Sequence, residues 1–323
     1  MTPREAFINA LDGGTPTGRV PHFELVFYLT MEAFGKVHPE HRTFGSWGQM
    51  SELERQLQRR DVAETYIAIA ERYEHSAIYV TGCYGLGKKD TIGETLRVCE
   101  FIREISGDTF CILVPGDGTY ALPGGNHMVE FAVQMAERPQ ELKDGAQRYV
   151  DIYRAAAERH KASGVVDGYC MCADYCFNDG PFMSPTQFDE FVTPYLKQTI
   201  DCYREHGLYA IKHTDGNIMP ILDSLVECRP HGLHSLDPQG GIDIAELKRL
   251  IGDQICLVGN VNCGLLQTGT DEECIESTRY ALQSGMPGGR YIFSTSNCVY
   301  TGMDLKRYDL IQDVWRREGN YDA

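Results

Sequence analysis

The sequence predicts an α/β protein built as a single (β/α)₈ TIM barrel, in which eight parallel strands alternate with helices. Short runs rich in Val, Ile and Tyr alternate with longer stretches of helical periodicity along the chain. Polar side chains recur just after these runs, where barrel proteins carry their sites. A doubly wound open sheet is the alternative, but the chain lacks a G-x-G-x-x-G after its first run and any G-x-x-x-x-G-K-[ST] motif.

The predicted strands are short and apolar, as expected for strands that are buried on both faces of a parallel sheet. We expect them at residues 20–27, 76–81, 109–114, 165–172, 208–213, 231–236, 255–261 and 290–294. Closure of these strands into a barrel is inferred from their number and alternation, because no local pattern encodes closure.

The stretches between the strands carry apolar residues at helical spacing beside charged residues. We expect helices at residues 139–161, 185–206, 219–228, 244–251, 271–284 and 304–317. Two segments, 29–72 and the Gly-rich 115–126, depart from the alternation, and long loops in compact domains are usually lids or binding loops. The prediction is one barrel domain over residues 1–323 with an N-terminal helical extension.

Composition excludes several classes of function. The chain has 323 residues, 42% of them hydrophobic and 24% charged, and a formal net charge of -16. So acidic a chain repels phosphate backbones and anionic lipid surfaces, so neither nucleic acid nor a membrane is an expected partner. The 12 cysteines lack the even spacing of a disulfide framework, and the start of the chain lacks the apolar core of a signal peptide. We therefore expect a cytoplasmic protein with reduced thiols.

Candidate site residues follow the predicted strands, at the end where barrel sites are built. They are Glu24, Asp174, Asn178, His213, Asp215, Asn217, Asp237, Asn260, Asn262 and Cys298. A carboxylate at such a position must be paired or used, which favours Asp174 as a functional residue. A structural hydrogen bond to the following loop is the alternative for this side chain.

The pattern His213-Thr-Asp215 is the most specific local signal for a metal site. Residues i and i+2 of a strand point to the same side, so these two side chains can converge on one ion. Closure of a barrel would bring Cys298, which follows the last strand, to the same rim. Imidazole, carboxylate and thiolate all bind zinc, and three protein ligands with one open position are typical of a catalytic site. The alternatives are a packed His, an Asp that caps the next helix, and an inert thiol.

A second cysteine-rich segment is weaker evidence for a metal. Cys170, Cys172 and Cys176 form a C-x-C-x₃-C pattern, but no second cluster is present to complete a four-thiolate site. The first two lie within a predicted buried strand. We interpret them as core thiols.

Three segments resemble the uroporphyrinogen decarboxylase superfamily: DGPFMSPTQFDEFVTPYLK, IKHTDGNIMPILDSLVE and GLHSLDPQGGIDIAELKRLIGDQICLVGNV. The likeness runs from about residue 165 to 310 and is greatest to the zinc-dependent methyltransferase branch, which includes the methylcobalamin:coenzyme M and O-demethylase methyltransferases. In that branch an H-x-C-G-N turn and a late Cys hold zinc. The resemblance implies that His213, Asp215 and Cys298 are the metal ligands here.

This chain departs from the superfamily pattern in two ways. Asp215 stands where the first Cys is expected, so a harder oxygen donor replaces a soft thiolate and the resemblance alone does not fix the identity of the metal. The Arg-rich turn with which uroporphyrinogen decarboxylases grip substrate carboxylates is replaced by RVPHFELVF, which carries Glu24. An acidic side chain there repels a polycarboxylate, so we expect no decarboxylation of uroporphyrinogen.

The resemblance therefore implies a methyltransferase that moves a methyl group between a small methyl ether, methylamine or thiol and the cobalt of a corrinoid. The chain has no D-x-H-x-x-G motif, so the corrinoid is expected on a separate partner protein. A homodimer is a further implication. The predicted roles are catalytic for Asp174, Asp237 and Glu24, cofactor-binding for Asn217 and Asn178, and zinc-binding for His213, Asp215 and Cys298. The alternatives are a metal-free decarboxylase of a small substrate and a non-catalytic binding protein.

Overall fold

The fold was analysed in a computed structural model that describes residues 1–81, 86 and 90–322. Within these residues, seven parallel strands form one sheet in the order β1-β2-β3-β6-β7-β8-β9. The strands are β1 (Ala77–Tyr79), β2 (Cys111–Pro115), β3 (Gly168–Met171), β6 (Tyr209–Thr214), β7 (Gly232–Ser235), β8 (Cys256–Val261) and β9 (Tyr291–Thr295). Each lies within one of the predicted runs or overlaps it. Cys83 lies outside the described residues.

The segment before β1 occupies the eighth strand position and joins the two edges of the sheet. The Phe23 N–H donates to the Phe293 carbonyl of β9 at 3.0 Å, and the Ser76 N–H donates to the His22 carbonyl at 2.7 Å. A backbone that bonds to β9 on one side and to the approach to β1 on the other closes the sheet. The expected TIM-barrel-like fold is confirmed.

The prediction of a regular strand at residues 20–27 is wrong. This segment makes isolated bridges with Phe293 of β9 and with Val299 after it, and bends at Leu25. Pro21 has no N–H to contribute to a ladder, which interrupts regular pairing at the start of the segment. The closure of the barrel is therefore carried by a few hydrogen bonds of an irregular chain.

Two apolar cores lie on the two sides of the barrel wall. The interior core holds alternate strand residues such as Leu113, Ile211 and Val258. Helix α1 (Pro3–Leu11) contributes Phe7 and Leu11 to this core, so it closes the amino-terminal end of the barrel. The larger core lies between the outer face of the strands and the surrounding helices. This alternation follows from the two-residue period of a strand.

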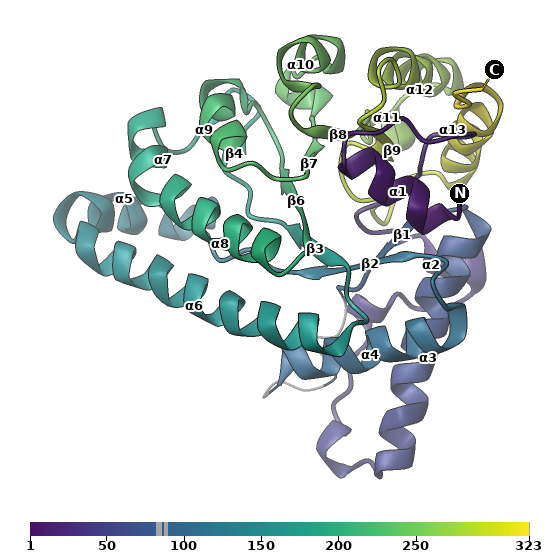
Figure 1. The fold of residues 1–323 in the computed structure, drawn as a ribbon, viewed down its shortest axis with the longest axis horizontal. Helices are drawn as coiled ribbons and strands as arrows, with labels where there is room; N and C mark the ends of the chain where they lie inside the picture. The colour runs from purple at the N-terminus through teal and green to yellow at the C-terminus, as the bar shows by residue number, and fades with distance from the viewer. Residues whose placement is uncertain (82–85, 87–89, 323) are drawn as a thin grey trace.

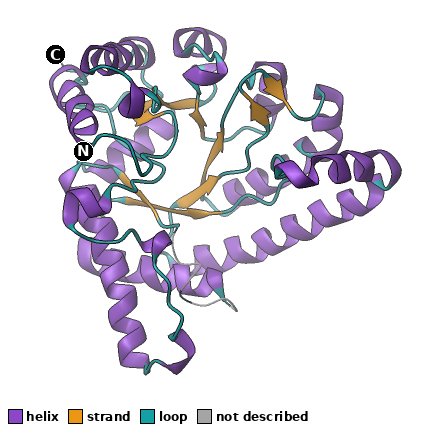
Figure 2. Cartoon of the chain, turned by 180° about the vertical axis from the view of Figure 1, so that it is seen from behind, coloured by secondary structure: helices purple, strands orange, loops and turns teal. Residues whose placement is uncertain are grey.

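The helices surround the strands, as Figures 1 and 2 show from opposite sides. They are α2 (Thr30–Phe34), α3 (Glu52–Arg72), α4 (Thr91–Ser106), α5 (Met128–Glu137), α6 (Pro139–Ser163), α7 (Pro185–Phe191), α8 (Thr193–Glu205), α9 (Leu222–Glu227), α10 (Ile244–Ile251), α11 (Leu265–Thr268), α12 (Asp271–Gly285) and α13 (Leu305–Glu318). Short 3₁₀ turns are η1 (Pro39–His41), η2 (Trp47–Gln49), η4 (Gly125–His127), η5 (Met219–Ile221) and η6 (Pro238–Gly240). Among the described helices, none has the length and apolar character needed to cross a membrane.

Most predicted helices are present, with two differences. The stretch 185–206 forms two helices with a break at Val192, because Pro194 lacks the N–H that would bond to the Glu190 carbonyl in a continuous helix. The long segment 29–72 contains helix α3, whose start is fixed by a capping box between Ser51 and Glu54. A hairpin of β4 (Cys176–Phe177) and β5 (Gly180–Pro181) follows β3.

Candidate metal centre

Three side chains meet at the carboxyl-terminal ends of β3 and β6. His213 lies within β6, Asp215 follows that strand, and Asp174 follows β3, its neighbour in the sheet. The His213 Nε2 lies 3.5 Å from Asp174 Oδ1 and 3.6 Å from Asp215 Oδ1. One ligand atom from each residue lies within 4.8 Å of the other two. These three residues are called the Asp-His-Asp cluster below.

The cluster combines a neutral imidazole with carboxyl groups that repel one another. Burial lowers the pKa of His213 to about 4, although the charge of Asp174 acts in the opposite direction. Burial, followed by the charge of Asp174, raises the pKa of Asp215 to about 7. Without a cation, the cluster thus concentrates negative charge and lone pairs in a small volume.

One carboxylate oxygen of Asp215 accepts a hydrogen bond, and the other has no hydrogen-bond partner in the described part of the chain. Its Oδ2 accepts a hydrogen bond from the side-chain amide of Asn297, which follows β9. Its Oδ1 is buried and has no hydrogen-bond partner among the described residues. An unsatisfied buried carboxylate oxygen is costly, and a bound cation would satisfy it. The sequence prediction missed Asn297, although it directly precedes Cys298.

The donor set fits a divalent metal ion. Zinc accepts one imidazole nitrogen and carboxylate oxygens, and three protein ligands leave one position for substrate or water. Two oxygens and one nitrogen form a harder set than one with thiolates, so manganese and iron are also suited to it. Asp174 is the most exposed member, with 41% of its side chain accessible, and therefore marks the open side of the cluster.

A buried ion pair, which the sequence prediction missed, fixes the loop that carries Asp174. The fully buried Lys212 points to the outer side of the barrel wall and donates to Asp117 Oδ2 at 2.7 Å and to the Ala173 carbonyl at 2.8 Å. Its ammonium group also lies 4.3 Å from the centre of the Tyr175 ring. The signal was a Lys that directly follows the apolar run Leu208–Ile211 within a predicted strand.

The same network holds the backbone beside the cluster. Asp117 Oδ2 accepts from the Ala173 N–H at 3.0 Å, and the Leu122 N–H donates to the Asp174 carbonyl at 2.7 Å. The Gly-rich segment 115–126, predicted as a lid or binding loop, therefore packs against the site through these bonds. Asp174 in turn accepts from the Asp215 N–H at 3.1 Å.

Asp237 and Asn217 have structural partners in this arrangement. Asp237 accepts from the Gly216 N–H at 3.3 Å and from the Gln239 N–H at 2.9 Å, so it holds the turn after β6 and caps η6. The Asn217 side-chain oxygen accepts from the Met219 N–H at 3.1 Å. Their predicted roles in catalysis and cofactor binding stay predictions. Their side-chain oxygen atoms accept hydrogen bonds from backbone N–H groups.

Glu24 lies in the closing segment and is 4% exposed. Its Oε2 accepts from the Thr295 hydroxyl at 2.5 Å, and its Oε1 lies 3.3 Å from His22 Nε2. The carboxylate therefore ties the closing segment to the end of β9. Its predicted catalytic role stays a prediction.

Cys298 and Asn178 do not join the Asp-His-Asp cluster. Among the described residues, the group of ligand atoms within 4.8 Å of one another does not include Cys298 Sγ. Burial raises the pKa of the Cys298 thiol, and nearby charges including Asp215 raise it further, which favours the thiol over the metal-binding thiolate. Asn178 is exposed at the turn of the β4–β5 hairpin. Ligation by Cys298 and cofactor binding by Asn178 stay predictions.

The cysteine-rich segment differs in part from the prediction. Cys170 and Cys176 are buried, as expected for core thiols. Cys172 is exposed, and its Sγ lies 3.5 Å from the Tyr79 hydroxyl. The prediction of a core thiol is therefore wrong for Cys172, because this residue follows β3 instead of belonging to it.

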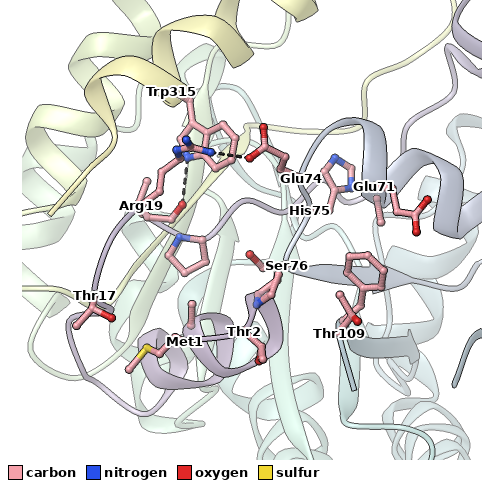
Figure 3. A pocket seen from close by; sticks show the side chains of 16 residues that line it. Met1, Thr2, Thr17, Arg19, Glu71, Glu74, His75, Ser76, Thr109 and Trp315 are labelled. Carbon is pink, nitrogen blue, oxygen red and sulfur yellow. Dashed lines mark hydrogen bonds and ion pairs between the residues drawn. The ribbon is translucent and has the colours of Figure 1, made fainter. Parts of the chain in front are cut away.

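A separate cavity lies away from the cluster, at the amino-terminal ends of the first strands. It has a volume of about 410 Å³ and is lined by residues that include Thr2, Arg19, Ser76 and Trp315 (Figure 3). Arg19 is already paired there with Glu74 at 2.6 Å. Sites in barrels of this type lie at the opposite end, so this cavity is not the candidate centre.

Comparison with known proteins identifies similar sequences and folds. A sequence profile described as "Uroporphyrinogen decarboxylase (URO-D)" matches residues 119–317. A methyltransferase from Methanosarcina mazei has the same fold with a TM-score of 0.70 and 17% sequence identity, covering 98% of this chain and 99% of that one. An endo-1,4-beta-xylanase from Penicillium canescens aligns with a TM-score of 0.43 and 11% identity over 72% of this chain and 81% of its own. No curated protein sequence matches this chain.

Proposed function

Since the chain belongs to the uroporphyrinogen decarboxylase (URO-D) family, which its profile match covers from residue 119 to 317, we propose that it is a metal-dependent methyltransferase. The methyl group would pass between a small methyl ether, methylamine or thiol and the cobalt of a corrinoid on a separate protein. The same-fold neighbour from Methanosarcina mazei is a methyltransferase, which supports this proposal.

The observation that carries the proposal is the Asp-His-Asp cluster with its unsatisfied Asp215 oxygen. His213, Asp215 and Asp174 would hold zinc, with Cys298 as an additional ligand if its side chain turns toward the cluster. Zinc supplies Lewis acidity, which lowers the pKa of a bound thiol or makes a bound heteroatom a better leaving group.

The protein side chains have separate tasks in this proposal. The buried His213 and the half-buried Asp215 form the fixed base of the site, and Asn297 orients the Asp215 carboxylate. Asp174 faces the open side and can contact substrate as well as metal. The Lys212–Asp117 pair keeps the Asp174 loop in place, so that substrate meets a preformed arrangement.

Elemental analysis combined with an activity assay tests the proposal. Protein purified without chelator should contain one zinc per chain, and His213→Ala and Asp174→Ala should each contain much less. Wild type should transfer a methyl group from methylcobalamin to a small thiol, or from a methyl donor to cob(I)alamin. Equal metal content in all three proteins would contradict the metal assignment. Cys298→Ser, measured beside them, decides whether the thiol is a ligand.

A metal-free decarboxylase is the second candidate, and one observation favours it. A pKa of about 7 makes Asp215 a competent general acid near neutral pH, as protonation of a carbanion after loss of CO₂ requires. Decarboxylation of a small acid by chelator-treated wild type, abolished in Asp215→Asn, would support this function. Loss of activity on chelation, with recovery on adding zinc, would support the methyltransferase.

A further inference from the structure

His213 is held from behind by a second histidine. The His213 Nδ1 lies 2.7 Å from the Nδ1 of His234, its register partner in β7. Two ring nitrogens form such a bond only when one carries a proton and the other a lone pair. The groups on the other side of His234 determine which of the two Nδ1 atoms carries the proton.

The Nε2 side of His234 contacts groups that set the direction of the hydrogen bond between His213 and His234. Its Nε2 lies 3.2 Å from the Thr295 carbonyl oxygen and 3.2 Å from Ser294 Oγ. A carbonyl only accepts, so the proton is on the His234 Nε2. Ser294 Oγ lies 3.4 Å from Glu24 Oε2, and a carboxylate also only accepts, so Ser294 donates to Glu24 and accepts from His234.

The remaining nitrogen of His234 then carries the lone pair. His234 is 1% exposed, and its hydrogen-bond partners among the described residues are a ring nitrogen, a hydroxyl and a carbonyl, none of them an anion that would stabilise a charged ring. A neutral ring with its proton on Nε2 accepts at Nδ1. His213 must therefore donate from its own Nδ1.

We propose that Glu24, Ser294 and His234 are positioning residues that hold His213 in its Nδ1-protonated tautomer, so that the Nε2 lone pair faces Asp174 and Asp215. This directed series of hydrogen bonds is called the Glu24–His213 chain below. The inference deepens the proposed function, since it rests on His213 as a metal ligand.

The Glu24–His213 chain favours the Nδ1-protonated tautomer of His213, whereas the Asp-His-Asp cluster alone would favour the Nε2-protonated one. Two carboxyl groups lie 3.5 and 3.6 Å from the His213 Nε2 and would attract an N–H at that position. Such a proton would occupy the lone pair that a metal needs. By binding the proton on the opposite nitrogen, the Glu24–His213 chain keeps the ligand atom free before any ion arrives. Groups that orient metal-binding histidines commonly contribute 10–100-fold to affinity.

The tautomer can be observed directly in the metal-free protein. Nitrogen-15 NMR of labelled histidine, assigned with His213→Ala, should show His213 protonated at Nδ1 and unprotonated at Nε2. In His234→Gln the amide oxygen can accept from His213 and the amide N–H can donate to Thr295, so the tautomer should persist. In His234→Leu the Nε2-protonated form should become dominant, and Glu24→Gln should shift the ratio in the same direction by a smaller amount.

Zinc affinity provides the second measurement, by competition with a chelating dye. We expect His234→Leu to bind about 10–100-fold more weakly than wild type and His234→Gln to bind within a few-fold of it. Thr278→Val, which removes a buried hydroxyl of α12 that bonds to the Cys274 carbonyl, is the control and should bind as wild type does. Circular dichroism of each variant checks that the barrel is folded.

An Nε2-protonated His213 in wild type, or a His234→Leu variant with wild-type tautomer and affinity, would overturn the inference. An unchanged ratio in Glu24→Gln would remove Glu24 from the chain. The tautomer is read without metal or substrate. A protein with the expected tautomer but without methyl transfer would therefore contradict the proposed function and leave the inference standing.

Discussion

At the residue scale, the ion pair of Lys212 and Asp117 connects the barrel wall to the loop before Asp174. Both groups are buried, and the pair is completed by bonds to the Ala173 backbone. Buried ion pairs are weak sources of stability, but an unpaired partner left behind is costly. Removal of one charge should therefore destabilise the protein more than removal of both.

Lys212→Met should lower the free energy of unfolding by about 3–5 kcal/mol, because it leaves the Asp117 carboxylate buried without its cation. Urea denaturation measures the change. The double variant Lys212→Met/Asp117→Asn removes both charges and should recover most of the loss. A double variant as unstable as the single one would contradict the unpaired-charge explanation.

The same pair should make stability sensitive to acid. Burial acts to raise the pKa of Asp117, but the charge of Lys212 and the hydrogen bonds outweigh it, and the net shift is downward. A carboxylate with a lowered pKa contributes its full stability above its unfolded value of about 3.9, and loses it as the pH falls through the folded value. The stability difference between wild type and Asp117→Asn should therefore shrink below about pH 4. A difference that stays constant from pH 6 to pH 3 would exclude this linkage.

At the element scale, helices begin at capping residues that can be recognised in the sequence. Thr270 accepts from the Glu273 N–H at 3.2 Å, and the Glu273 side chain accepts from the Thr270 N–H at 2.7 Å, which together form a capping box at the start of α12. This helix packs against α13 and against β8, so its first turn supports the barrel wall.

Thr270→Ala should destabilise the protein by about 1 kcal/mol, since the first turn of α12 loses its side-chain acceptor. Thermal denaturation measures the effect. Thr270→Asp keeps an acceptor at the cap and should stay close to wild type, while an equal loss in both variants would argue against capping as the cause.

At the scale of the whole molecule, closure of the barrel depends on the irregular segment that includes His22 and Phe23. Its hydrogen bonds to β9 and toward β1 replace the ladder of a regular strand. We expect the amides of Phe23 and Ser76 to exchange with solvent as slowly as that of Leu233 in the middle of the sheet. Hydrogen exchange followed by NMR checks this. Fast exchange at both amides, with Leu233 protected, would mean that the barrel opens at this seam.

The charge of the whole molecule gives a prediction about substrate. The net charge is -16, and Glu24 lies where a cationic grip on substrate carboxylates would be needed. Purified protein should therefore leave uroporphyrinogen unchanged. Coproporphyrinogen in the reaction mixture, measured by chromatography with a genuine uroporphyrinogen decarboxylase as positive control, would refute this.

The sequence by itself determined the features that are encoded locally. Short apolar runs located the seven strands, and helical spacing located most of the helices, because both depend on neighbouring residues. The same-side geometry of His213 and Asp215 follows from their position along one strand. The polar residues at strand ends marked the correct end of the barrel.

Only the tertiary structure decided which of these residues meet. Asp174 joins His213 because β3 and β6 are neighbours in the sheet, although the β4–β5 hairpin lies between them in the sequence. Cys298 follows β9 and stays outside the cluster, although Asn297 directly before it bonds to Asp215. The partners Lys212–Asp117 and His213–His234 were likewise invisible in the sequence. Contacts between distant segments depend on strand order, register and loop path, which local periodicity does not encode.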